Sequence, residues 1–84
     1  MTEEEILLQR IAIDPKVMVG KPVIKGTRVP VELIVKLVAN GATHKEILKD
    51  YPQLTEEDIK ASLLYAAKLL RNEEIYPINI GKQC

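Results

Sequence analysis

Residues 21–32 read KPVIKGTRVPVE, and this stretch decides how the chain is organised. Its first half places β-prone Val23 and Ile24 before Gly26, a pattern typical of a short strand that ends in a turn. Its second half reaches Pro30, which suits the first position of a helix because its missing N–H would have no partner there. The stretch therefore predicts a basic β element that leads directly into a helical region.

Positive charge is concentrated around this stretch. The chain has 84 residues with twelve basic and twelve acidic side chains, so its net charge is zero. Between Arg10 and Arg28, however, five basic residues accompany a single acid, Asp14. Nucleic-acid affinity depends on local neutralisation of phosphates more than on total charge, so a nucleic acid is a candidate partner.

Three helical segments are predicted after the basic stretch. The first covers residues 30–40, where apolar residues recur at helical spacing until Gly41 supplies a left-handed stop. The second covers residues 44–50 and follows a capping box that begins at Thr43. The third follows another capping box and covers about residues 55–73. These lengths and short turns predict a mainly α, three-helix helix-turn-helix domain preceded by a short β-hairpin or strand pair.

We accordingly expect one domain, residues 1–84, in four parts. They are an N-terminal arm (1–9), a basic β segment (10–29), a three-helix bundle (30–73) and a tail (74–84). The arm is either a short helix or a frayed end, because no firm cap is recognised before it. A chain this short buries only about 60–65% of its unfolded surface, which favours dimerisation as a source of stability.

The third predicted helix carries more apolar side chains than one buried stripe requires. The inward stripe is predicted to consist of Ile59, Leu63, Ala66 and Leu70. Leu64, Tyr65 and Leu69 lie beyond that stripe. We therefore predict that these three side chains form a homodimer contact.

Composition excludes several kinds of protein. The one cysteine, Cys84, rules out an internal disulfide framework, and no long apolar run predicts a membrane span. The N-terminus is acidic where a secretory signal would be basic. His44 has no second metal ligand at useful spacing, and no nucleophile–base constellation is present, so we expect neither an enzyme nor a cofactor. These features favour a cytoplasmic protein with no membrane partner.

Beyond these physical patterns, the sequence resembles a known family over about residues 10–70. The similar runs are IDP at 13–15, GKPVIKGTRVPV at 20–31, Gly41, EIL at 46–48, DYPQLTEEDI at 50–59 and YA at 65–66. They resemble the bacterial family called domain of unknown function 433. The resemblance implies a homeodomain-like or winged-helix-like fold, and a VapB-type antitoxin whose partner is a PIN-like ribonuclease toxin.

Candidate DNA contacts lie in the basic segment and on the second helix. They are Lys21, Lys25 and Arg28 in the segment, and His44, Lys45 and Lys49 on the helix. Arg28 has an alternative role, since pairing with Glu32 or Asp14 would hold the segment on the helices. The third helix is a poor base reader, because residues 56–58 are three carboxylates that repel phosphate and suit the positive end of the helix dipole.

The tail offers a separate candidate surface. Tyr76, Ile78 and Ile80 alternate along it, and Lys82 follows them. Such a segment is predicted either to add as a strand to a partner protein or to pack within the molecule or its dimer. Two functions therefore compete: a dimeric antitoxin that binds a toxin and its own operator DNA, and a protein-interaction module that binds a partner without touching DNA.

Overall fold

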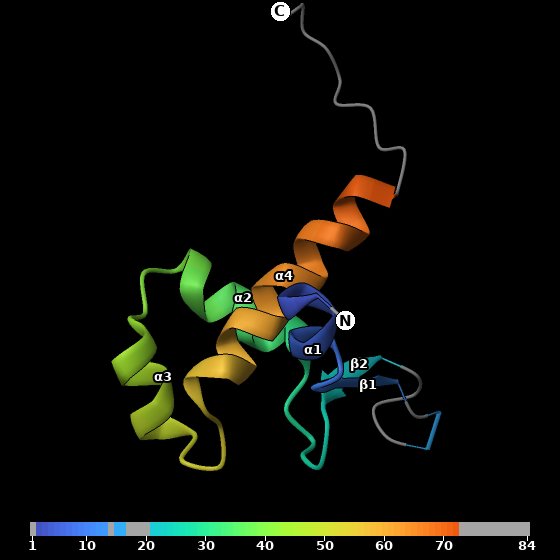
Figure 1. The fold of residues 1–84 in the computed structure, drawn as a ribbon. Coiled ribbons are helices and arrows are strands. Elements are labelled where there is room, and N and C mark those ends of the chain that lie inside the picture. Colours follow the sequence, from blue (N-terminus) through green and yellow to red (C-terminus); the bar gives the residue numbers. More distant parts are fainter. Residues whose placement is uncertain (1, 14, 17–20, 73–84) are drawn as a thin grey trace, which may run out of the picture.

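Helices dominate the described part of the chain, which comprises residues 2–13, 15–16 and 21–72 of a computed structural model. In chain order the elements are α1 (Glu3–Leu8), β1 (Ile11–Ile13), β2 (Pro22–Ile24), α2 (Val31–Ala39), α3 (His44–Asp50) and α4 (Glu56–Asn72). Figure 1 shows the strand pair and α3 on opposite sides of the lower end of α4. The predicted mainly α fold with an N-terminal strand pair is confirmed.

The N-terminal arm is a capped helix. The prediction that no cap precedes it was wrong, since Thr2 and Glu5 form a capping box at the start of α1. Thr2 Oγ1 accepts the backbone N–H of Glu5 at 3.1 Å, and Glu5 Oε1 accepts that of Thr2 at 2.9 Å. α1 then packs along α4, where Lys68 Nζ lies 3.4 Å from Glu4 Oε1. The arm is thus part of the helical domain.

The strand pair supports the helices from one end. β1 and β2 run antiparallel, with Ile11 opposite Ile24. The chain turns back after β2, so that Val23 also forms a bridge with Pro30. A two-stranded ribbon is marginal in water by itself, so this one depends on burying Val23 and Ile24 against the helices.

Local signals set the boundaries of α2 and α3. α2 begins at Val31, with Pro30 extended at the N-cap, so the predicted helix start was one residue early. The helix ends before Gly41, whose φ of +94° is the left-handed stop that the sequence predicts. α3 begins after Thr43, whose Oγ1 accepts the N–H of Glu46 at 3.1 Å. Its predicted bounds are confirmed.

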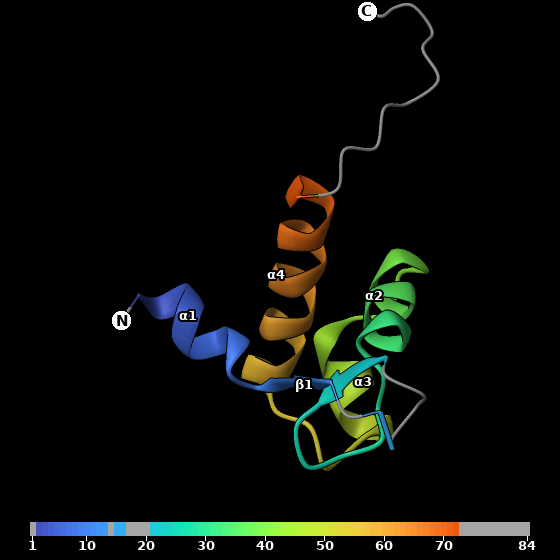
Figure 2. The ribbon, with the colours of Figure 1, turned by 90° about the vertical axis from the view of Figure 1, so that its right-hand side faces the viewer.

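The core lies where β2, α2, α3 and the first half of α4 meet. Its buried cluster consists of Ile24, Val29, Ile34, Ile47, Leu54 and Ile59. On α4, Ala61 and Ser62 are also buried, whereas Leu70 is 65% exposed. The predicted inward stripe was therefore wrong at Leu70, because the last turns of α4 extend beyond the neighbouring elements (Figure 2). Among the described residues, no helix combines the length and apolarity needed to cross a membrane.

Candidate nucleic-acid interface

The turn after β2 holds its residues in a fixed backbone conformation. Ile24 O accepts the N–H of Thr27 at 3.0 Å, and Gly26 at the tip has a φ of +82°, which L side chains rarely adopt. Thr27 Oγ1 donates to Ile24 O at 2.8 Å and accepts the N–H of Val29 at 3.0 Å. Ile24 N–H donates back to Val29 O at 2.9 Å. The backbone of this turn is therefore fixed by its own hydrogen bonds.

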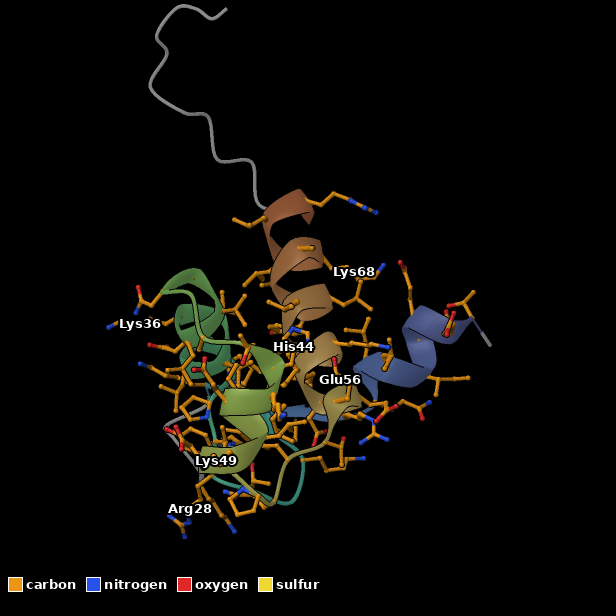
Figure 3. All side chains as sticks on the ribbon, turned by 90° about the vertical axis from the view of Figure 1, so that its left-hand side faces the viewer. Arg28, Lys36, His44, Lys49, Glu56 and Lys68 are labelled. Carbon is orange, nitrogen blue, oxygen red and sulfur yellow. The ribbon has the colours of Figure 1, made fainter. Side chains whose placement is uncertain are left out.

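Four exposed cations on the turn after β2 and on α3 have no acidic partner within the described residues: Lys25, Arg28, Lys45 and Lys49. The first two are exposed on the turn, and the other two are exposed one helical turn apart on α3. Figure 3 shows Arg28 and Lys49 at the end of the domain opposite the last turn of α4. We name these four residues the cationic end. Such side chains can neutralise phosphates without first breaking an internal ion pair.

Two other predicted DNA contacts have acidic partners. Lys21 Nζ lies 3.5 Å from Glu32 Oε1, so the ion pair of Glu32 is with Lys21 and not with Arg28. His44 Nδ1 lies 2.5 Å from Glu56 Oε2, and Figure 3 shows the two side chains pointing toward one another between α3 and α4. Either residue would have to give up its partner to contact a phosphate. The sequence pattern alone contained no signal for the contact between His44 and Glu56.

Arg10, the first cation of the basic segment, is bound to α4. Its Nη1 donates to Asp58 Oδ1 at 3.1 Å, across 48 positions of the sequence. Asp58 is only 5% exposed, and its Oδ2 accepts the N–H of Thr55 at 2.9 Å while Thr55 Oγ1 accepts that of Asp58 at 3.3 Å. Ser62 Oγ also donates to Asp58 O at 2.9 Å. Arg10 and Asp58 therefore join the β segment to the capped start of α4.

The carboxylates at the start of α4 have contacts that the sequence did not predict. The helix dipole was expected to account for all three carboxylates, but Asp58 and Glu56 have the specific partners described above. Of the three, Glu57 is exposed, Glu56 is partly exposed and Asp58 is buried. In an ordinary helix-turn-helix the first turn of the second helix approaches the bases, and this first turn offers carboxylates instead of donors. Any phosphate contact is therefore favoured at the cationic end.

A second surface is an open, mainly apolar groove between α2 and α4, with a volume of about 510 Å³. Val31, Val35 and Ala39 line it from α2, and Tyr65, Ala66 and Leu69 line it from α4. Two of the three predicted dimer residues, Tyr65 and Leu69, thus share this groove. Leu64, the third, is half-buried and is not part of the lining.

Several predicted sites have no described counterpart. Asp14 and the predicted partner-binding residues Tyr76, Ile78, Ile80 and Lys82 lie outside the described residues, as does Glu73, the predicted end of the third helix. Across the part of the chain that the structure describes, no three His, Cys, Asp or Glu side chains gather as a metal site requires.

Comparison with known proteins identifies the family of this chain. Residues 11–66 match the family described as protein of unknown function, DUF433. The chain belongs to this family. The resemblance seen in the short sequence runs is thereby confirmed, and the match covers both the strand pair and most of α4.

The similar proteins have names that state no activity, and a solved structure among them shares the fold. An uncharacterized protein of Archaeoglobus fulgidus is 60% identical over 30 residues, which are 36% of this chain and 83% of the relative. The uncharacterized protein y4eO of Sinorhizobium fredii is 36% identical over 56 residues, 67% of this chain but only 25% of the relative. A crystal structure of a DUF433 member from Anabaena variabilis has a TM-score of 0.71 at 37% identity, covering 80% of this chain and 66% of that one.

Proposed function

We propose that this DUF433 protein is a cytoplasmic antitoxin that binds a PIN-like ribonuclease toxin and, as a dimer, its own operator DNA. The proposal assigns the chain no catalytic role. The observation that carries the DNA part is the cationic end, where Lys25 and Arg28 on the fixed turn and Lys45 and Lys49 on α3 lack acidic partners among the described residues.

These side chains are attached to an ordered backbone, which favours a phosphate contact. A lysine or arginine on a hydrogen-bonded turn or a short capped helix loses less backbone freedom on binding than one on an unstructured arm. α3 is anchored by Ile47 in the core, and the turn is anchored by Ile24 and Val29 in the same cluster. The two cationic elements are therefore held in a fixed relation through their buried neighbours.

Charge reversal tests the cationic end directly. We expect the double variant Lys25→Glu, Arg28→Glu to weaken binding to a duplex from the protein's own promoter and to flatten the plot of log affinity against log salt. The slope should change by about 0.9 per lost phosphate contact, hence by about 2 for both residues. Fluorescence anisotropy over a salt series measures both quantities.

The matched control for either single change, Lys25→Glu or Arg28→Glu, is Lys60→Glu, which makes the same change in net charge at an exposed position in the first half of α4. We expect this control to bind with nearly the original salt slope. Equal losses in the single variants and the control would assign binding to total charge and contradict a specific role for the cationic end.

A second candidate function is a protein-interaction module that neutralises its partner without DNA. The first turn of α4 favours it, because Glu57 is exposed there and Glu56 faces His44 where a base-reading helix would present donors. Co-expression with a PIN-like ribonuclease separates the two functions. Growth rescue by a wild-type protein that shows no affinity for duplex DNA would establish the second function and exclude the first.

A further inference from the structure

The groove between α2 and α4 adjoins exposed apolar side chains at the end of α4. Leu69 on its wall is 45% exposed, and Leu70 beside it is 65% exposed. Both lie in the last turns of α4, which project past the other elements in Figure 2. One chain therefore presents both a hollow and a protruding apolar helix end.

We propose that a second copy of this chain covers the groove, and that the projecting end of each α4 packs against the α2–α4 groove of the other copy. This inference deepens the dimeric state that the proposed function includes, by assigning it a surface. A two-fold contact uses the same patch on both subunits, so the patch must be complementary to itself. An apolar hollow next to an apolar protrusion meets that requirement.

The charges at the edge of the groove are also self-complementary. Glu32 and Lys36 lie one turn apart on α2 and both border the groove. Lys36 has no ion pair within the described residues, and the contact of Glu32 with Lys21 is between two exposed side chains. Across a two-fold axis, Lys36 of each copy can approach Glu32 of the other, and opposite charges at the rim fix the register of such a contact.

The remaining surfaces stay free in this arrangement. Figure 2 shows α1 and α2 on opposite sides of α4, so a partner on the α2 side leaves α1 uncovered. The cationic end lies opposite the last turn of α4, where Figure 3 places Arg28 and Lys49. The dimer contact and the DNA contact can therefore be altered separately.

Sedimentation of the full chain without DNA tests the interface. We expect a dimer at micromolar concentration for the wild type, and self-association weakened by about tenfold or more for Leu69→Lys and for Val35→Lys, because each buries an unpaired charge. Lysine near the C-terminus of α4 also suits the helix dipole, so Leu69→Lys should stay folded by circular dichroism. Ile6→Lys is the matched control, since Ile6 is an exposed apolar residue of α1; it should remain a dimer.

A charge swap tests the register. Glu32→Lys and Lys36→Glu each place like charges across the two-fold axis, so each alone should weaken the dimer. An equimolar mixture of the two variants should restore it as a heterodimer, which a merely structural role of either residue cannot produce.

Other outcomes of these experiments would contradict the proposed dimer contact. A monomeric wild type, or a Leu69→Lys variant that remains as dimeric as the control, would overturn the inference. If a monomeric wild type became a dimer after removal of residues 73–84, the groove would be covered by the chain's own C-terminal segment instead. Because no DNA is present, failure of the proposed operator binding would leave these readouts unchanged.

Discussion

The two halves of α4 belong to one continuous helix but have very different surroundings. In residues 56–62, Ile59 is completely buried and Asp58 is only 5% exposed, because β2, α2, α3 and the turn before α4 pack around this half of the helix. In the last turns, Leu69 and Leu70 are exposed. Apolar side chains occur in both halves at helical spacing. The difference shows that burial on this helix depends on how far its neighbours extend and not on its own periodicity.

The core contact at Ile59 should show the largest difference between the halves. Replacing Ile59 with alanine leaves a cavity in the buried cluster, and we expect a loss of about 2–5 kcal/mol in the free energy of unfolding. The same change at Leu70 should alter the free energy of unfolding of a single chain by less than about 0.5 kcal/mol, because within one chain that side chain is 65% exposed. Urea denaturation of both variants, at protein concentrations below and above dimer formation, measures the contrast. A loss at Leu70 that grows with protein concentration would come from the second copy that the proposed dimer packs against this end of α4.

The ion pair at Asp58 should have the next largest effect. Asp58→Ala removes the carboxylate that accepts the N–H of Thr55 and the hydrogen bond of Arg10. We therefore expect the free energy of unfolding to fall by about 1–3 kcal/mol. Glu57→Ala, one position earlier and exposed, is the control and should cost little. A double-mutant cycle with Arg10→Ala isolates the pair. Zero coupling in that cycle would show that the cap alone gives Asp58 its importance.

The smallest effects are expected at the two partly exposed polar contacts along α4. The side chain of His44 contacts that of Glu56 near the start of the helix, and Lys68 forms an ion pair with Glu4 near its end. All four side chains are at least one-third exposed, so His44→Ala and Lys68→Ala should each cost less than about 1 kcal/mol. Thermal unfolding at low and high salt provides the measurement. A substantially larger loss for His44→Ala would indicate that this contact is needed to hold α3 against α4.

Much of the local architecture could be predicted because its causes lie within a few residues. The capping box at Thr43, the left-handed Gly41 and the bounds of α3 each follow from side chains no more than one turn away. The same kind of signal was present at Thr2 and Glu5 but was overlooked, which left the N-terminal arm unassigned. The sequence therefore does contain a signal for the start of α1.

The candidate sites could be predicted only in part. Sequence reasoning identified Lys25 and Arg28 as cations near a turn and Tyr65 and Leu69 as surplus apolar residues. It did not show that Arg10 is bound by Asp58, because no sequence pattern links positions 48 apart. It also placed Leu70 in the core. Periodicity predicts the face of a helix on which a side chain lies, but not whether another element packs against that face.

The sequence by itself determined the order of strands and helices, their caps and stops, and the family to which the chain belongs, since these depend on short runs of residues. Tertiary structure alone decided which charges are paired and which apolar side chains are covered. Lys21 and His44 have acidic partners while Lys25 and Lys49 have none among the described residues, although all four are cationic candidates in the sequence. The physical reason is that ion pairing and burial depend on distances in space, which are fixed only when β2, α2, α3 and α4 pack around one core.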